Sequence, residues 1–270
     1  MIIPFSKMHG AGNDFILVDD RSNTFPFEDR QWLAETAARR TGVGCEGIIG
    51  VQQSETADFR MRFFNPDGCE VEMCGNGARC VARYAFDRKL APEHMRIETA
   101  AGILEAQIQD PDVKLLMTKP DKLAINLKLF FDKDELSYGF ANTGVPHVVI
   151  KVPELREFDV KGIGAKIRYH EDFRPKGTNA NFIAIDGPGE ISVRTYERGV
   201  EDETLACGTG ITAAAIIACL SGEVSPPVSV NTAGGDKLVV DLRLQGNEAE
   251  NVSLLGPAVY TFNGELEYNS

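Results

Sequence analysis

Short apolar runs alternate with glycine- and asparagine-rich turns along this chain of 270 residues, and the same order of runs occurs twice. A strand-like run follows a glycine-containing turn at 14–18 and again at 147–151, 133 positions later. An amphipathic stretch comes next in each half, at 28–40 and at 160–169, with apolar residues at helical spacing. The pattern therefore indicates a duplication of one structural unit.

Further strands are predicted after these helices, at corresponding places in the two halves. The expected pairs are 48–51 with 182–185, and 59–64 with 191–196. The second strand of each half leads toward a cysteine. Alternating apolar and polar residues predict two more strands in the second half, at 237–244 and 259–267.

A helix is predicted shortly after each of these cysteines. Residues 211–220 are apolar on every side and end before Gly222, so this helix must be enclosed by other structure. Its counterpart at 78–90 carries more arginine and is expected to be covered on fewer sides. Because strands outnumber helices, we predict an α+β fold with two pseudo-symmetric domains. Each would be a curved, barrel-like mixed or antiparallel sheet wrapped around a central helix.

The join between the two domains is expected at a Lys-Pro-Asp-Lys stretch near the middle of the chain. The N-terminal domain would then cover 1–120 and carry Cys74. The C-terminal domain would cover 121–260 and carry Cys207. The last strand, 261–270, is a candidate to cross back and complete the first domain.

Composition and charge exclude several functional classes. Hydrophobic residues make up 43% of the chain and charged residues 25%, as in ordinary soluble domains. No uncharged apolar run approaches the ~20 residues of a membrane-spanning helix. The formal charge of −12 and the absence of a basic tract argue against a nucleic-acid or anionic-membrane surface. The N-terminus lacks the pattern of a signal peptide, so a cytoplasmic location is expected.

The six cysteines are expected to be reduced thiols, because a chain without an export signal rarely forms disulfides. Cys69, Cys74 and Cys80 are separated by four and five residues, which is not the usual spacing of zinc ligands. No metal is therefore expected. Cys45, Cys80 and Cys219 are interpreted as small buried hydrophobic residues.

Cys74 and Cys207 differ from the others because each begins a Cys-Gly-x-Gly motif. The motif places a thiol beside unpaired N–H groups at the start of a helix, where a thiolate or a bound carboxylate is stabilised. Inverting an α-carbon requires one group to remove a proton from one face and another to return a proton on the other face. Two such thiols therefore indicate acid/base chemistry on one substrate.

Several other polar residues allow both a structural and a functional interpretation. His147 follows a turn, where histidine is often a structural hydrogen-bonding residue. Glu197 and Arg198 end a predicted strand and form either a solvated surface pair or a carboxylate clamp. Taken alone, three asparagines in loops beside strands are turn residues: Asn13, Asn65 and Asn179.

Together these segments resemble the diaminopimelate epimerase family of cofactor-independent amino-acid epimerases. The resemblance rests on six motifs that follow one another over nearly the whole chain: 8–15, 64–68, 72–77, 178–182, 196–199 and 204–210. It implies conversion of LL-2,6-diaminopimelate to meso-diaminopimelate in lysine and peptidoglycan precursor synthesis, without pyridoxal phosphate, another cofactor or a metal. The partner it implies is this small-molecule substrate; whether the chain forms a homodimer stays open.

The resemblance also implies roles for particular residues. Cys74 and Cys207 would be the acid/base pair. Backbone donors at the reacting carbon's carboxylate would come from Gly75, Asn76, Gly208 and Thr209. The distal end of the substrate would be held by Asn13, Asn65, Asn179, Glu197 and Arg198. His147 and Glu197 would tune the pKa values of the two cysteines.

Two positions depart from the pattern of the family. Some members have asparagine where this chain has Val145, and some have glutamine where it has Gly47. Neither side chain present here can replace that contact, so part of the distal pocket differs.

Three alternative functions compete with this interpretation. A proline or hydroxyproline racemase shares the two cysteines, but it typically has histidine where Asn76 stands and needs no distal clamp. A Cys–His hydrolase using Cys74 and His147 leaves Cys207 unexplained. A non-catalytic binding module of duplicated barrels is the third alternative.

Overall fold

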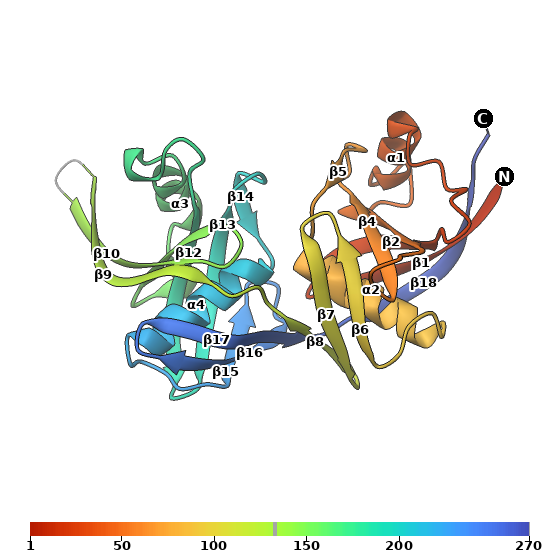
Figure 1. Ribbon diagram of the computed structural model, residues 1–270. Helices are drawn as coiled ribbons and strands as arrows, with labels where there is room; N and C mark the ends of the chain where they lie inside the picture. Colours follow the sequence, from red (N-terminus) through yellow and green to blue (C-terminus); the bar gives the residue numbers. More distant parts are fainter. Residues whose placement is uncertain (132–133, 270) are drawn as a thin grey trace. The chain divides into compact units, whose positions relative to one another are not determined.

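The computed structural model describes residues 1–131 and 134–269, and its chain forms two compact units (Figure 1). Unit 1 contains Met1–Leu115 together with Gly256–Ser270, and unit 2 contains Leu116–Leu255. Strands predominate in both units, and each has a long helix that begins directly after a cysteine. The predicted α+β fold with two similar domains is therefore confirmed.

Unit 1 is built from elements at both ends of the chain. Its elements in chain order are β1 (Ile2–Gly10), β2 (Asn13–Asp19), α1 (Arg30–Ala37), β3 (Gly47–Gln52), β4 (Phe59–Phe64), β5 (Glu70–Val71), α2 (Gly75–Asp87), β6 (His94–Thr99), β7 (Gly102–Gln109), β8 (Asp112–Leu116) and β18 (Val259–Glu267). The C-terminal strand β18 pairs antiparallel with β1 along most of its length.

Unit 2 is continuous in sequence. Its elements are β9 (Asp121–Phe131), β10 (Asp134–Asn142), β11 (Pro146–Lys151), α3 (Val160–Arg168), β12 (Asn179–Gly187), β13 (Glu190–Glu197), β14 (Asp202–Thr204), α4 (Gly208–Leu220), β15 (Val228–Thr232), β16 (Lys237–Gln245) and β17 (Glu248–Gly256). Two short 3₁₀ helices, Leu155–Glu157 and Glu171–Phe173, flank α3.

The two units share one pattern of strand pairing. β2 runs parallel to β3 and β11 parallel to β12, and the register of the two pairs is the same after a shift of 133 residues: Phe15 faces Gly47, and Val148 faces Ala180. β4 and β6 are parallel, as are β13 and β15. In unit 2 the strand beside β10 is β9. In unit 1 the corresponding place beside β1 is taken by β18.

The central helices α2 and α4 are enclosed by the strands of their own units. α4 contacts seven strands, β9 to β13, β15 and β16, and it is buried almost throughout. This confirms the expectation for the apolar helix. The expectation that α2 would be covered on fewer sides is wrong, because every residue from Asn76 to Ala85 is buried.

The buried arginines of α2 explain this difference. Arg79 has no exposed surface, and its guanidinium donates to the side chain of Asn76 and to the carbonyl of Pro257. Arg83 is 8% exposed and pairs with Asp87 and Asp110. Arg83 is thus paired with carboxylates, and the Arg79 guanidinium is hydrogen-bonded to two carbonyl oxygens, which lowers the cost of burying each charge.

Helix boundaries depart from the sequence prediction in a consistent way. α2 and α4 begin at the glycine directly after the cysteine, so each Gly-x-Gly segment is the first helical turn and not a loop before it. α1 is shorter than the predicted 28–40, because Asp29 caps its N-terminus by accepting a hydrogen bond from the Trp32 amide.

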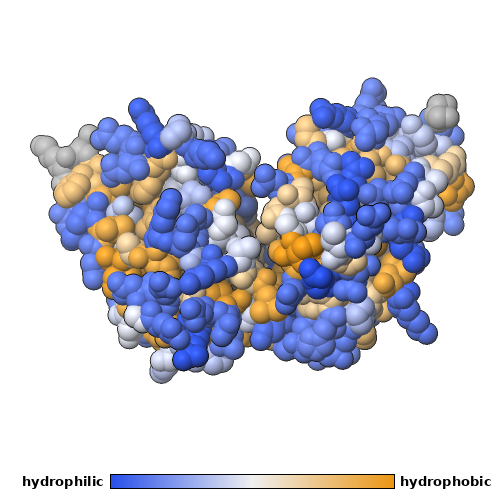
Figure 2. Space-filling model, in the orientation of Figure 1, coloured by the Kyte–Doolittle hydropathy of each residue, from blue (hydrophilic) through white to orange (hydrophobic). Residues whose placement is uncertain are grey.

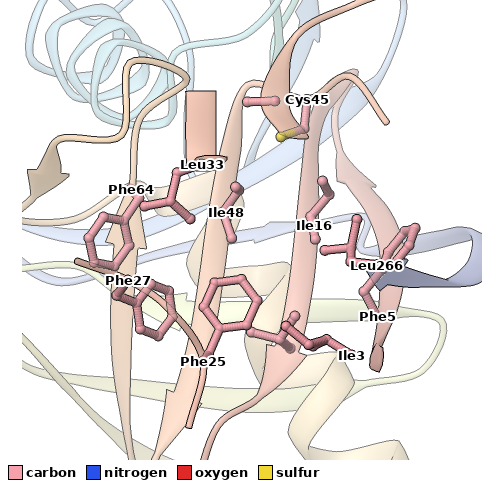
Figure 3. Packing of buried hydrophobic residues seen from close by; sticks show 12 residues of the cluster. Ile3, Phe5, Ile16, Phe25, Phe27, Leu33, Cys45, Ile48, Phe64 and Leu266 are labelled. Atoms are coloured by element: carbon pink, nitrogen blue, oxygen red, sulfur yellow. The ribbon is translucent and has the colours of Figure 1, made fainter. Parts of the chain in front are cut away.

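Each sheet also packs against its second helix. In unit 1 one hydrophobic cluster contains Leu33 of α1, Ile48 of β3, Phe64 of β4 and Leu266 of β18 (Figure 3). The rings of Phe27 and Phe64 stack there with their centroids 4.5 Å apart. In unit 2 a corresponding cluster forms around α3. Strand β3 is buried on both faces, and its sequence is therefore an almost continuous apolar run.

Hydrophilic side chains cover much of the face shown in Figure 2, and the hydrophobic residues there form small groups between them. Within residues 1–131 and 134–269, no helix is long and apolar enough to cross a membrane.

The place of β18 in unit 1 leads to a stability prediction. Leu266 is 8% exposed and belongs to the cluster around α1, so Leu266→Ala should lower the free energy of unfolding of unit 1 by about 2–4 kcal/mol. The exposed neighbour Glu265 offers a matched control, and Glu265→Ala should change it by less than about 0.5 kcal/mol. Urea unfolding followed by hydrogen exchange of β1 and β11 amides measures both. Equal effects of the two substitutions would contradict the role assigned to β18.

Candidate active site

A tight hairpin positions Asn13 against the start of α2. Ala11 and Gly12 form the two-residue turn between β1 and β2, with φ angles of 54° and 80°, as a turn with two left-handed residues requires. The hairpin lies close to the helix, since a Cβ on Gly10 would be 2.9 Å from the carbonyl oxygen of Asn76. Asn13 is the first residue of β2 and therefore reaches the N-terminal turn of α2.

Cys74 is the N-cap residue of α2. Its backbone is extended, with φ −136° and ψ 123°, and the helix begins at Gly75. The Cys74 Sγ donates to Asn13 Oδ1 over 3.5 Å. A Cβ built on Gly75 would have no atom of the described residues within 4 Å, so there is open space beside the first helical turn. N–H groups at such a turn bind carboxylates well.

A chain of hydrogen bonds continues from this cysteine in both directions. The Arg79 guanidinium donates to Asn76 Oδ1 over 2.9 Å, and Asn76 Nδ2 donates to Asn13 Oδ1 over 3.4 Å. Asn13 Nδ2 donates in turn to the carboxylate of Glu46. Of these residues, Asn76 and Arg79 are buried, whereas Glu46 is half exposed.

A cluster of charged side chains adjoins the Asn13–Glu46 end of this hydrogen-bond chain. Asp14 forms ion pairs of 2.7 Å with both Lys7 and Arg39. Burial by itself would raise the pKa of Asp14, but the hydrogen bonds from Arg39 and Lys7 outweigh it, and the pKa is lowered. Arg39 also lies 3.5 Å from Glu46, so the carboxylate that receives the Asn13 amide is itself held beside a cation.

Asn65 follows β4 in a turn of unit 1. Its carbonyl accepts from the Gly68 amide and its amide donates to the Cys69 carbonyl, both over 2.9 Å. Gly68 has a φ of 75°, and a Cβ there would be 2.6 Å from the carbonyl oxygen of Arg30, so only glycine suits this turn. The structure thus places Asn65 at the strand end that leads to Cys74.

Cys207 occupies the same place in unit 2. It is the N-cap residue of α4, with an extended backbone (φ −112°, ψ 108°), and is 6% exposed. Its Sγ lies 3.6 Å from the Thr209 hydroxyl. The Thr143 hydroxyl donates to the Thr209 carbonyl over 3.0 Å, which ties the β10–β11 loop to the first turn containing Gly208.

His147 is fully buried on β11 and belongs to a second polar chain. The Thr195 hydroxyl donates to Asn181 Oδ1 over 3.0 Å, and Asn181 Nδ2 lies 3.2 Å from His147 Nδ1. Because the Asn181 amide also donates to the Val148 carbonyl, its nitrogen faces the imidazole, and His147 Nδ1 is the acceptor. The ring proton is therefore on Nε2, which is buried and makes no hydrogen bond to the described residues.

The imidazole of His147 is held neutral. The pKa of His147 is lowered to about 3, mainly by burial and to a smaller extent by the positive charge of Arg198. The side chain also stands close to the helix start through its neighbour, since a Cβ on Gly210 would be 2.4 Å from Asn181 Oδ1. The structure therefore holds a neutral imidazole on β11, and the Asn181 side chain links it to the first turn of α4.

The remaining predicted residues of unit 2 lie together at the ends of β12 and β13. Asn179 is 2% exposed; its Oδ1 accepts from the Arg198 amide over 2.8 Å, and its Nδ2 donates to the Pro146 carbonyl over 3.0 Å. Glu197 accepts from the Thr204 hydroxyl over 2.8 Å. Asn179 thus fixes the loop that carries Arg198, and its side chain is less accessible than that of Arg198.

Sequence reasoning did not single out Glu46, Arg79 or Asn181. A signal was present for Glu46, which lies 133 residues before Asn179 and so occupies the corresponding strand start. Asn181 is part of the Thr-Asn-Ala-Asn-Phe motif. For Arg79 no local signal existed, because an arginine near a helix start normally faces solvent.

The other buried cysteines agree with their structural interpretation. Burial raises the pKa of Cys45 to about 11, that of Cys80 to about 12 and that of Cys219 to about 11, so all three stay protonated thiols. Across residues 1–131 and 134–269, no cluster of three or more His, Cys, Asp or Glu side chains is arranged to hold a metal ion.

Comparison with solved structures defines the class of fold. A phenazine biosynthesis protein of the PhzF family from Bacillus anthracis superposes with a TM-score of 0.73, at 18% identity, over 99% of this chain and all of that one. A hydroxyproline epimerase from Agrobacterium vitis with bound trans-4-hydroxy-L-proline also reaches 0.73, at 16% identity, over 98% of this chain and 91% of that one. At these identities the likeness establishes the fold that this chain shares with an epimerase and with PhzF-family proteins.

Sequence comparison identifies the family within this fold. The profile of diaminopimelate epimerase matches residues 5–123 and 139–261. A diaminopimelate epimerase from Aquifex aeolicus is 40% identical over 274 residues, which cover 97% of both chains. The chain therefore belongs to the diaminopimelate epimerase family.

The neutral state of His147 leads to a pH prediction. Its pKa is about 3 in the folded protein, below the ordinary 6.5, so the unfolded chain takes up a proton first as the pH falls. The stability that His147 contributes above pH 6.5 is therefore lost as the pH falls toward 3. Between pH 7 and pH 5 this loss should be about 2 kcal/mol.

Urea unfolding at these two pH values measures the effect in three proteins. In His147→Gln the loss should be smaller by about 2 kcal/mol than in the unmodified protein. In His94→Gln it should be unchanged, because the His94 side chain is 72% exposed. An unaltered pH dependence in His147→Gln would contradict the assignment of a neutral, buried imidazole.

Proposed function

We propose that this protein interconverts LL- and meso-2,6-diaminopimelate without a cofactor, with Cys74 and Cys207 as its two acid/base groups. The observation that carries the proposal is the repetition of one arrangement in a chain of this family. In each unit a cysteine caps the enclosed central helix, and small residues follow it in the first helical turn.

The two cysteines would act on opposite faces of the same α-carbon. One, as thiolate, removes the α-proton, and the other, as thiol, delivers a proton to the opposite face. A single fixed group cannot do both. Repulsion between two thiolates disfavours the doubly ionised pair, so the two cysteines titrate together and one proton is shared between two sites.

The helix N-termini supply stabilisation for the charge that develops during proton removal. As the α-proton leaves, negative charge moves onto the adjacent carboxylate. The N–H groups of Gly75, Asn76, Gly208 and Thr209 belong to first helical turns and are suitable donors to this carboxylate. Both helices are enclosed, so these donors are already in position and need little reorganisation.

The distal end of the substrate carries a second carboxylate and a second ammonium group. Arg198 suits this carboxylate and Glu197 the ammonium. Glu197 is the last residue of β13, and Arg198 follows it directly. Asn13, Asn65 and Asn179 would complete the contacts, with Asn179 acting mainly by fixing the Arg198 loop. Val145 and Gly47 cannot hydrogen-bond through their side chains, which leaves the distal end more dependent on Arg198.

The proposed chemistry requires both cysteines as thiols or thiolates. Reducing conditions maintain this state, which favours a location in the cytoplasm. A single copy of the chain carries both cysteines, so the reaction does not need a second subunit to supply one.

A proline or hydroxyproline racemase is the second candidate function, favoured by the fold shared with the hydroxyproline epimerase. Two features argue for the longer substrate: Asn76 stands where those enzymes typically have histidine, and Arg198 is available as a clamp. Exchange of the α-proton with solvent tests both. The protein in deuterium oxide should label LL-diaminopimelate and leave L-proline and trans-4-hydroxy-L-proline unlabelled.

Removing either catalytic sulfur should abolish turnover. Cys74→Ala and Cys207→Ala should each lower kcat for epimerisation at least 1000-fold, on the order of the 10²–10⁴-fold contribution of a general acid or base. Circular dichroism should show that both variants remain folded. Cys69→Ala provides the matched control, because Cys69 is partly exposed in the loop between β4 and Cys74 and should be dispensable. Full turnover without Cys74 or Cys207 would disprove the two-base mechanism.

Loss of the proposed clamp should affect long substrates specifically. Arg198→Ala should lower kcat/KM for diaminopimelate about 100-fold, which corresponds to loss of a charge-assisted bidentate contact. Arg198→Lys should recover only part of it, because an ammonium cannot form the planar fork. Steady-state kinetics measure both variants. An unchanged kcat/KM in Arg198→Ala would rule out this residue as the distal clamp.

A further inference from the structure

The hydrogen-bond chain in unit 1 has a fixed direction. A guanidinium can only donate and an ionised carboxylate can only accept. The Arg79 guanidinium at one end therefore turns the Asn76 carbonyl toward itself, and the Glu46 carboxylate at the other end turns the Asn13 N–H₂ toward itself. Both amide groups between them point the same way, which joins Arg79 to Glu46 through Asn76 and Asn13.

The direction of this hydrogen-bond chain determines which atom of Asn13 faces the Cys74 Sγ. With its nitrogen held by Glu46, Asn13 presents Oδ1 to the Cys74 Sγ, which donates to it over 3.5 Å. A hydrogen bond that the thiol donates favours the protonated form, whereas an amide N–H₂ in the same place would favour the thiolate. The orientation of the Asn13 side-chain amide therefore determines whether Asn13 favours the thiol or the thiolate form of Cys74.

We infer that Glu46 is a positioning residue that acts through Asn13 and biases Cys74 toward the thiol in the resting protein. Glu46 would act on the sulfur by fixing the orientation of the Asn13 amide, which contacts it. This inference rests on the proposed acid/base role of Cys74.

Other charged and titratable groups surround this arrangement and set the controls. Lys7 and Arg39 compensate Asp14 on the neighbouring hairpin, and Arg39 also lies beside Glu46. Cys80, six residues after Cys74 in α2, is fully buried and stays a thiol, since burial raises its pKa to about 12. The negative charge of Glu46 also acts on Cys74 directly through space, so a test must separate that charge from the orientation of Asn13.

The rate of alkylation of Cys74 by iodoacetamide, measured against pH, tests the inference directly. All proteins carry Cys207→Ala, so that Cys74 titrates without its partner. Fragment-ion mass spectrometry distinguishes Cys74 from Cys69, which lies on the same tryptic peptide. Because this measurement requires no substrate, absence of epimerase activity would count against the proposed function and leave the test of Glu46 intact.

Glu46→Ala removes the acceptor that holds the Asn13 N–H₂. The orientation of this amide then depends on the long, 3.4 Å bond from Asn76 Nδ2 to Oδ1, so the N–H₂ can turn toward the sulfur. The midpoint of the alkylation profile should fall by about one pH unit, roughly tenfold more thiolate below the midpoint. Glu46→Gln retains an acceptor for Asn13 and should stay within about 0.3 units of the parent. Glu28→Ala removes a carboxylate of the same unit that is 97% exposed, and should also leave the midpoint unchanged.

A double-mutant cycle completes the experiment. In Asn13→Ala the amide is absent, so adding Glu46→Ala should produce no further shift. Three results would overturn the inference: an unchanged midpoint in Glu46→Ala, an equal shift in Glu46→Gln, or additive shifts in the double variant. The last two would show that the charge of Glu46 acts on the sulfur without Asn13. Because Glu46 is 49% exposed, these substitutions should not impair folding.

Discussion

Enclosure of a helix within its own sheet is the constraint on which the rest of each unit depends. A helix that is buried on all sides can offer unpaired N–H groups only at its first turn. In α2 and α4 this turn begins at a glycine directly after a cysteine. The same packing that builds the core therefore brings a thiol and a set of backbone donors to one place, and it does so twice.

The two copies differ in the polar groups around their cysteines. In unit 1 charged side chains lie near the start of α2: Arg79 is fully buried, and Asp14 is paired with Lys7 and Arg39. In unit 2 the buried His147 is neutral and is oriented by Asn181, while the charged residues Glu197 and Arg198 lie at and just after the end of β13. Such inequality suits the proposed reaction, in which one end of the substrate reacts and the other end is only held.

Unit 1 shows how a duplicated chain resolves an unpaired edge. Its first strand needs a neighbour that unit 2 obtains from β9, directly before β10. In unit 1 the C-terminal strand β18 takes this place beside β1, and Leu266 joins the core around α1. Unit 1 is therefore completed by residues that are distant in sequence from its other strands.

The sequence by itself determined the α+β class, the duplication at a spacing of 133 residues, most strands, and Cys74 and Cys207 as candidates, because periodicity and repeated motifs are local signals. Only the tertiary structure revealed the burial of Arg79, the coupling of Glu46 to Asn13 and the neutral state of His147. These properties depend on desolvation and on partners distant in the chain, and neither is encoded in the spacing of residues along one segment.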